Sequence, residues 1–144
     1  MIKSGTIITA TDTFIGDILI EGEKIIQIGV DLHPVDAREF DAAGKLVLPG
    51  GVDPHTHFDL PMFNTVSSDD HYTGHKAAAF GGTTTVIDFV SQDFSTLKES
   101  VEAWHIKADT KAAIDFSFHM NITHLDEDIL AEIPLLPEVM TPIE

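Results

Sequence analysis

The chain has 144 residues, and 43% of them are hydrophobic, a share typical of folded globular proteins and too high for a disordered chain. It carries 24 acidic and 8 basic residues, for a formal net charge of −16, and no Lys/Arg cluster, so we expect neither nucleic acid nor an anionic membrane surface as a partner. No apolar stretch approaches the ~20 residues needed to cross a membrane, and cysteine is absent, which excludes disulfides and thiol nucleophiles and is compatible with a cytoplasmic location.

Residues 1–50 are predicted to form a small β-sandwich module of short strands. In chain order, the expected strands cover residues 7–8, 17–20, 24–28, 38–41 and 45–48. Short turns containing Gly22 and Gly44 join the last four of these strands as two hairpins. A module of this size offers too little apolar surface to be comfortably stable by itself.

The most informative stretch is residues 50–57, Gly-Gly-Val-Asp-Pro-His-Thr-His, which follows an apolar run at 46–48 that is typical of a buried strand. Side chains alternate between faces along an extended chain, so His55 and His57 are expected on the same side. Neutral imidazole suits zinc and its neighbours, and a metal ion held in this way lowers the pKa of a bound water. Ligands at the carboxyl ends of strands are typical of α/β barrels, so the motif indicates a metal-dependent hydrolase, although isolated pairs of this kind also occur on surfaces.

After residue 51, strands rich in β-branched residues alternate with helices. Two further strands are expected at 83–90 and 114–120, and helices are expected from Ser67 or Ser68 to Phe80, from near Ser95 through Ala108, and from Asp126 to Ile133, where Pro134 and Pro137 stop the last one. The second helix places Leu97, Val101, Trp104 and Ala108 on one face. The alternation predicts an α/β fold of parallel βαβ units. Residues 51–144 are too few to close a (β/α)8 TIM-like barrel, which needs about 250 residues, so they are either the first βα units of an incomplete barrel or a smaller three-stranded unit.

Four further residues are candidates for a role outside this motif. His71 and His75 lie four residues apart on the first expected helix, but the metalloprotease pattern is absent, and a place near the helix start favours an exposed face. Asp88 lies within an apolar strand, where an unpaired carboxylate is costly, so it is expected to orient a ligand or to bind a backbone amide. His119 is expected on the neighbouring parallel strand, either facing the metal pocket, where it supports a metal ligand or the substrate, or hydrogen-bonded in the core.

An apolar loop follows the histidines directly. It contains Leu60, Met62 and Phe63. Such loops usually pack down as structure, but beside a metal ion the same side chains can line a pocket for an apolar part of a substrate. Both interpretations stay open from the sequence.

Three stretches, residues 50–57, 65–70 and 77–85, together strongly resemble the hydantoinase/dihydropyrimidinase family of the amidohydrolase superfamily, and residues 104–105 and 114–119 continue the likeness. The resemblance covers essentially the whole chain and matches the N-terminal portion of the family. It implies a distorted TIM barrel preceded by a β-sandwich module. It also implies hydrolysis of a cyclic diamide, in which a hydantoin or dihydropyrimidine ring is opened to an N-carbamoyl amino acid, and assembly as a homotetramer.

The same resemblance implies a specific metal centre. Two divalent ions, Zn²⁺ most often and Mn²⁺ as the alternative, are bridged by a carboxylated lysine that lies outside this segment, and His55 and His57 bind the more buried ion. The loop that contains Leu60, Met62 and Phe63 corresponds to one that gates the substrate. No catalytic residue falls within the segment, so the 144 residues alone are expected to be inactive. The alternatives are another cyclic amidohydrolase, such as a dihydroorotase or allantoinase, and a non-catalytic relative that serves as an oligomeric scaffold.

Overall fold

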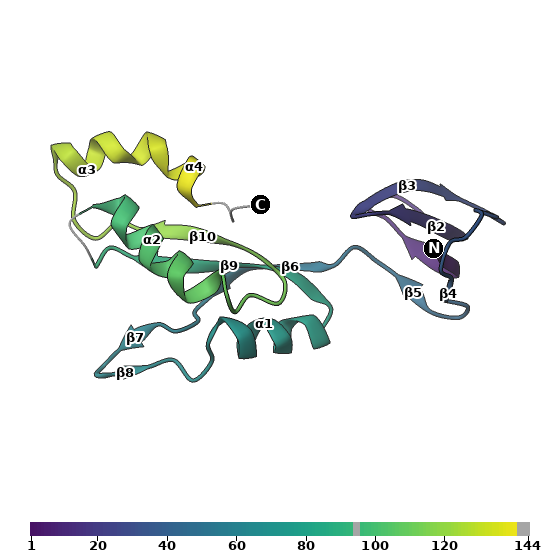
Figure 1. Ribbon diagram of the computed structural model, residues 1–144, viewed down its shortest axis with the longest axis horizontal. Coiled ribbons are helices and arrows are strands. Elements are labelled where there is room, and N and C mark those ends of the chain that lie inside the picture. Colours follow the sequence, from purple (N-terminus) through teal and green to yellow (C-terminus); the bar gives the residue numbers. More distant parts are fainter. Residues whose placement is uncertain (94–95, 141–144) are drawn as a thin grey trace. The chain divides into compact units, whose positions relative to one another are not determined.

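The computed structural model describes residues 1–93 and 96–140, and the chain divides between Pro49 and Gly50 into two compact units (Figure 1). The division falls one residue before the expected end of the N-terminal module. Within the described ranges, no helix is long and apolar enough to span a bilayer.

The N-terminal unit is a five-stranded sheet. Its strands are β1 (Ile2–Ile8), β2 (Thr13–Glu21), β3 (Lys24–Gly29), β4 (Phe40–Asp41) and β5 (Leu46–Val47). The order is β3-β2-β1-β4, and β5 also pairs with β1. The expected hairpin at Gly22 is confirmed: β2 and β3 are antiparallel, and Gly22 has φ +58°, a left-handed conformation that glycine adopts without steric cost.

The second expected hairpin is wrong. Strands β4 and β5 do not pair with each other but both run parallel to β1, β4 beside Ile2 and Lys3 and β5 beside Thr6 and Ile7. The turn between them closes with a 2.9 Å hydrogen bond from the Lys45 N–H to the Ala42 carbonyl. The chain therefore leaves β1 after β4 and returns to it as β5 in the same direction. The turn residues alone do not distinguish this arrangement from a hairpin.

The strand expected to be buried at 46–48 is also corrected. Leu46 is 64% exposed and Leu48 is 56% exposed, and the strand ends at Val47. Several other large aliphatic side chains of this sheet are exposed as well: Ile15, Ile25, Ile26 and Ile28. The N-terminal unit thus buries little apolar surface of its own, as its small size leads one to expect.

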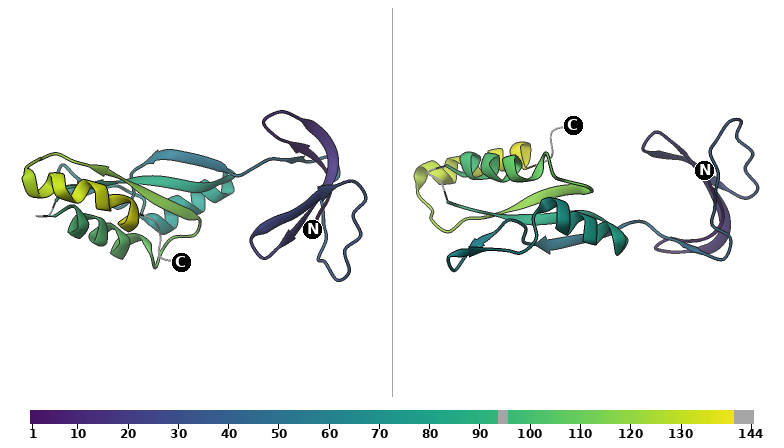
Figure 2. Two further views of the ribbon diagram at one scale, coloured as in Figure 1. Left: turned by 90° about the horizontal axis from the view of Figure 1, so that it is seen from above. Right: turned by 60° about the horizontal axis from the view of Figure 1, so that its bottom comes forward.

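The second unit is built on three parallel strands in the order β10-β9-β6. These strands are β6 (Gly51–Thr56), β9 (Thr83–Ser91) and β10 (Asp115–Asn121), joined through α1 (His71–Phe80) and α2 (Leu97–Ala108). A small hairpin of β7 (Pro61–Met62) and β8 (Thr65–Val66) precedes α1, and α3 (Glu127–Glu132), η1 (Ile133–Leu135) and α4 (Leu136–Val139) follow β10 beside α2 (Figure 2). The expectation of parallel βαβ units is confirmed.

The start of α1 differs from the expectation. Its N-cap is Asp70, not Ser67 or Ser68: the Asp70 carboxylate accepts the Thr73 N–H at 2.8 Å, and the Thr73 hydroxyl accepts the Asp70 N–H at 3.1 Å. Ser67 is instead used by the preceding hairpin, where its hydroxyl accepts the Leu60 N–H at 3.0 Å. Four consecutive capping residues precede this helix, so the choice among them depends on tertiary contacts.

The end of the chain also differs from the expectation. Helix α3 ends at Glu132, but Pro134 and Pro137 do not stop the helical path, because each occupies the first turn of the next short helix, η1 or α4. Proline is tolerated at that position since its missing N–H has no intrahelical partner there. Ser95, the expected start of the second helix, lies outside the described residues, and the N-cap of α2 is Thr96.

The core of the second unit forms between α2 and the sheet. The four residues expected on one face of α2 are all at most 2% exposed, as predicted: Leu97, Val101, Trp104 and Ala108. They pack in one cluster with Val86 and Val90 of β9 and with Phe116 and Phe118 of β10. Alternate residues of each strand therefore face the helices, and the remaining ones face the other way.

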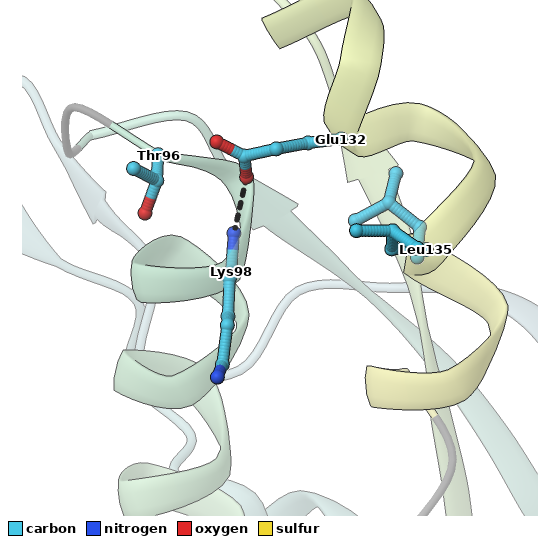
Figure 3. A pocket seen from close by; sticks show the side chains of 5 residues that line it. Thr96, Lys98, Glu132 and Leu135 are labelled. Carbon is cyan, nitrogen blue, oxygen red and sulfur yellow. Dashed lines mark hydrogen bonds between the residues drawn. The ribbon is translucent and has the colours of Figure 1, made fainter. Parts of the chain in front are cut away.

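Contacts from α3 stabilise the N-terminus of α2. One Glu132 carboxylate oxygen accepts the backbone N–H of Leu97 at 2.9 Å and that of Lys98 at 3.2 Å (Figure 3). A cavity of about 180 Å³ beside this contact is lined mainly by apolar atoms, including those of Leu135. Because the Glu132 carboxylate is bound by the N-terminus of α2, we interpret this contact as a structural cap and not as a reaction site.

Candidate functional site

The two histidines of the motif lie at the carboxyl end of β6. His55 is within the strand, His57 follows it by one residue, and their ring centroids are 5.1 Å apart. Both rings also contact Phe89 of the neighbouring strand, at centroid distances of 4.5 and 5.2 Å. Both side chains are exposed. The structure thus brings the two imidazoles together on one open face of the sheet.

His119 joins them on that face. In the β9–β10 register it pairs with Phe89, and their ring centroids are 5.0 Å apart. Its Nε2 atom donates to the Pro54 carbonyl at 3.1 Å, which leaves Nδ1 of the neutral ring unprotonated. His119 is exposed, so the interpretation as a core histidine is wrong. A third imidazole therefore shares the face of His55 and His57.

Asp88 lies on the opposite, helix-covered face. It is 1% exposed, and both of its carboxylate oxygens lie 3.3 Å from the backbone nitrogen of Phe58, the residue after His57. Of the two roles considered for Asp88, the structure shows the bond to a backbone amide. Burial raises the pKa of the Asp88 carboxyl to about 6, because a charged group loses hydration there.

His71 and His75 are fully buried, at 0% exposure, so the expectation of an exposed face is wrong. His71 and His75, the first and fifth residues of α1, lie on the helix face that packs on the sheet, and both imidazoles contact the Phe58 ring, at centroid distances of 5.4 and 5.3 Å. Burial, together with the neighbouring His75, lowers the pKa of His71 to about 4, and burial also lowers the pKa of His75.

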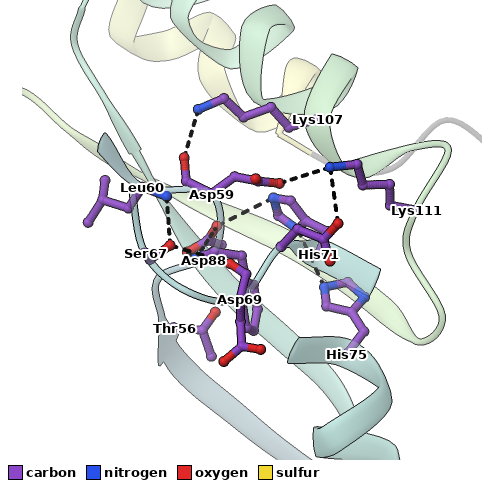
Figure 4. A network of polar contacts seen from close by, with 12 residues as sticks. Thr56, Asp59, Leu60, Ser67, Asp69, His71, His75, Asp88, Lys107 and Lys111 are labelled. Atoms are coloured by element: carbon purple, nitrogen blue, oxygen red, sulfur yellow. Dashed lines mark hydrogen bonds and ion pairs between the residues drawn. The ribbon is translucent and has the colours of Figure 1, made fainter. Parts of the chain in front are cut away.

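The turn that follows the histidines is fixed by groups that the sequence analysis did not single out. Asp59 has φ +48°, and its backbone N–H donates to the Asp69 carbonyl at 3.0 Å. Lys107 donates to the Asp59 carbonyl at 3.2 Å, and Lys111 lies 3.3 Å from the Asp59 carboxylate and 3.2 Å from that of Asp70 (Figure 4). The sequence signal was a pair of lysines four residues apart at the end of the second helix.

The apolar loop after the histidines is a hairpin. Phe63 and Asn64, which join β7 to β8, have φ values of +48° and +63°, as a two-residue type I′ turn requires. Phe63 is 95% exposed and Met62 is 43% exposed, whereas Leu60 packs against the core. The loop is thus only partly packed down, and its apolar tip is open to solvent.

A glycine allows α1 to approach this segment. The Cβ atom of an alanine at position 74 would overlap the Phe58 ring. We expect Gly74→Ala to lower the free energy of unfolding by about 1–3 kcal/mol, although the same change in an open helix is usually stabilising. Urea unfolding followed by circular dichroism measures the change. Adding Phe58→Leu should restore part of the loss, and an unaltered midpoint for Gly74→Ala alone would contradict this packing.

No group of three or more His, Cys, Asp or Glu residues arranged to hold a metal ion occurs in residues 1–93 and 96–140. His55 and His57 fit as two members of a larger ligand set, because they are adjacent, exposed and at the end of a parallel strand. His71 and His75 do not fit as a pair of metal ligands. The Ala113 N–H donates to Nδ1 of His75 at 3.3 Å, so the proton of the neutral His75 ring is on Nε2, the nitrogen that faces His71 and that a metal ion between the two rings would need.

The chain is similar in sequence to known hydrolases. It is 49% identical over 139 residues to a D-hydantoinase from Geobacillus stearothermophilus, in a match that covers 96% of this chain and 30% of the relative. It is 41% identical over 145 residues to a D-hydantoinase from Streptomyces coelicolor, covering 96% and 31%. The chain thus spans about 30% of the length of these curated relatives. No protein-family model matches the sequence.

Solved structures give the same result. A D-hydantoinase crystal structure superposes with a TM-score of 0.93 at 48% identity, over 96% of this chain and 30% of that one. The dihydropyrimidinase from Brevibacillus agri NCHU1002 superposes with a TM-score of 0.89 at 47% identity, over 92% and 29%. The matched part comprises the β-sandwich portion and the start of the barrel, as expected for the fold class.

Proposed function

Because the chain belongs to the hydantoinase/dihydropyrimidinase family, as an N-terminal segment of about 30% of its members' length, we propose that it contributes two metal ligands to a cyclic amidohydrolase. The reaction is hydrolysis of a cyclic amide, with a hydantoin or dihydropyrimidine ring opened to an N-carbamoyl amino acid. The observation that carries the proposal is the placement of His55 and His57 side by side at the carboxyl end of β6.

In this proposal, His55 and His57 would hold a divalent ion, Zn²⁺ or Mn²⁺, as part of a two-ion centre whose other ligands, a carboxylated lysine among them, lie outside these 144 residues. A bound ion supplies a Lewis acid that polarises the ring carbonyl and lowers the pKa of water. The chain's own residues orient the imidazoles and line the space around them. Phe89 fixes the two imidazole planes by ring contact, and the Pro54 carbonyl orients His119, which faces the same space and supports a ligand or the substrate.

The hairpin residues have a separate role in this proposal. Leu60 anchors the hairpin in the core, while Met62 and Phe63 present apolar side chains at its exposed end. An apolar ring substituent of the substrate is the group that such side chains bind. The cytoplasmic location and homotetrameric assembly belong to the same proposal, and they rest on the absence of cysteine and on the family resemblance, respectively.

A chimeric enzyme tests the proposal. The 144 residues replace the matching 30% of the Geobacillus stearothermophilus D-hydantoinase, and ring opening of hydantoin and dihydrouracil is measured together with metal content. We expect a metal-loaded chimera that opens at least one of these rings, whereas the 144-residue chain alone should open neither. A folded chimera without bound metal would contradict the proposal and favour a non-catalytic scaffold. A folded, metal-loaded chimera that prefers dihydroorotate or allantoin would favour another amidohydrolase branch.

A further inference from the structure

A series of polar groups connects the loop before β10 with the segment that follows His57, and Figure 4 shows its buried middle part, His75, His71 and Asp88. It begins at the Ala113 N–H, which donates to Nδ1 of His75 at 3.3 Å. Nε2 of His75 then lies 3.4 Å from Nδ1 of His71, and Nε2 of His71 lies 3.6 Å from a carboxylate oxygen of Asp88. Four residues from two elements, α1 and β9, and one loop are thereby connected.

The direction of the donors in this series is fixed at its first contact. A backbone N–H can only donate, so Nδ1 of His75 is an acceptor and the proton of its neutral ring is on Nε2. That proton points at Nδ1 of His71, so the proton of the neutral His71 ring is on Nε2 and faces Asp88. Within the described ranges, Nε2 of His71 forms no hydrogen bond, and the Asp88 carboxylate, 3.6 Å away, is the acceptor that it faces.

This series of polar groups ends at the peptide bond between His57, a proposed metal ligand, and Phe58. The Asp88 carboxylate faces two donors, the His71 imidazole and the Phe58 backbone N–H. An ionised carboxylate accepts the Phe58 N–H and is the acceptor that faces the His71 N–H, whereas an amide in its place would turn a donor toward one of these two donors. Because Phe58 follows His57 directly, the position of this carboxylate constrains the backbone from which the His57 ring projects.

The burial of His71, His75 and Asp88 indicates that these polar groups have a role other than filling space. His71 and His75 are 0% exposed and Asp88 is 1% exposed, and aromatic rings such as Phe58 and Phe116 surround the imidazoles. Apolar side chains would fill the same volume without the cost of desolvating polar groups. A buried series in which each donor faces an acceptor favours one arrangement of its members.

We propose that Ala113, His75, His71 and Asp88 form a positioning relay, which holds the Phe58 amide and thereby orients the His57 imidazole toward a metal ion. The inference rests on the proposed function, since it requires that His57 bind metal. It concerns residues on the helix side of the sheet, which touch neither metal nor substrate. The relay is therefore expected to change metal retention and to leave the identity of the substrate unchanged.

The direct test determines which ring nitrogen of His71 and of His75 carries the proton, and it needs no substitution. In the full 144-residue chain labelled with ¹⁵N-histidine, NMR distinguishes protonated from unprotonated ring nitrogens. We expect both His71 and His75 to carry their proton on Nε2 at neutral pH. A proton on Nδ1 of either ring would overturn the relay, because the sequence of donors would be broken. This readout does not depend on metal binding or on activity.

The second test measures metal retention in the chimera. Asp88→Asn should accelerate transfer of Co²⁺ to a chelator by about tenfold. This is the lower end of the loss in metal affinity that usually follows removal of a group that orients a metal ligand. Adding His71→Phe removes the donor that faces the new amide, so the double variant should recover part of the retention. Ser100→Ala is the matched control: Ser100 is also fully buried, but its hydroxyl donates within its own helix turn, to the Thr96 carbonyl at 3.0 Å.

The outcomes separate the two proposals. If the wild-type chimera folds and binds no Co²⁺, the proposed function fails, and with it the metal-orienting role. If the wild type binds Co²⁺ but Asp88→Asn releases it no faster than Ser100→Ala does, the relay is overturned and the proposed function stands. Should Asp88→Asn fail to fold, His71→Phe alone provides the comparison, with faster release than the wild type expected and equal release contradicting the relay.

Discussion

Replacing His57 by alanine in the chimeric enzyme is expected to lower kcat/KM for ring opening by about 10³-fold or more. The reason is the loss of a proposed metal ligand: a catalytic metal contributes several kcal/mol of transition-state stabilisation, and each 1.36 kcal/mol is a factor of ten in rate. His55→Ala should have a similar effect, since the two rings lie side by side on one face. Initial rates and bound metal, measured on the same preparations, check both expectations.

The double variant His55→Ala/His57→Ala sharpens this experiment. Ligands that act as one unit have non-additive effects, so the double variant should be little worse than either single one. The matched control is His124→Ala, because His124 is also exposed but pairs with Asp126 at 3.4 Å, far along the chain from the motif. Activity within about twofold of wild type is expected for this control, as for most surface substitutions. Wild-type activity and metal content in His57→Ala would refute the assignment.

The parts of the fold that the sequence predicted are those with strong periodicity. Leu97, Val101 and Trp104 recur at helical spacing, and β-branched residues from Thr83 onward, directly after two glycines, mark a strand. All three of the helix residues are buried as expected. The alternation in residues 50–57 likewise predicted that His55 and His57 share a face, because strand geometry alone sets that relation.

The errors occurred where local signals are satisfied by more than one arrangement. The turn at Gly44 suggested a hairpin, yet it is a bulge between two segments that both run parallel to β1. For α1, four consecutive residues can cap a helix; Asp70 does so, and His71 and His75 lie buried in the first two turns. Which face of a helix packs on the sheet is set by tertiary contacts, so the burial of these two residues did not follow from the local sequence.

The partners of the residues that support the site could not be identified from the sequence. Asp88 was expected to need a partner, but its partners are a backbone amide thirty residues earlier, at Phe58, and an imidazole from α1. The lysines that hold Asp59 come from the end of α2, about fifty residues later. Such contacts depend on how the elements pack, and the local pattern of a single chain carries little information about them.

Trp104→Ala is expected to lower the free energy of unfolding by about 3–5 kcal/mol, a large part of the 5–15 kcal/mol that stabilises an ordinary domain. Trp104 is 2% exposed within the core cluster, so its removal leaves a cavity between α2 and the sheet. It also supports Lys107, whose ammonium lies 3.7 Å from the centre of the indole. Since Lys107 donates to the Asp59 carbonyl, the same substitution loosens the turn that follows the histidines.

Urea unfolding followed by far-ultraviolet circular dichroism measures this change without relying on the lost indole. Ile106→Ala is the matched control on the same helix, because Ile106 is 80% exposed and its truncation should alter stability by no more than about 0.5 kcal/mol. A loss below about 1 kcal/mol for Trp104→Ala would mean that α2 does not pack as described. If Trp104→Phe retains most of the stability yet weakens metal retention in the chimera, then Lys107 acts through the indole, and packing of the core and order at the site are linked by this one side chain.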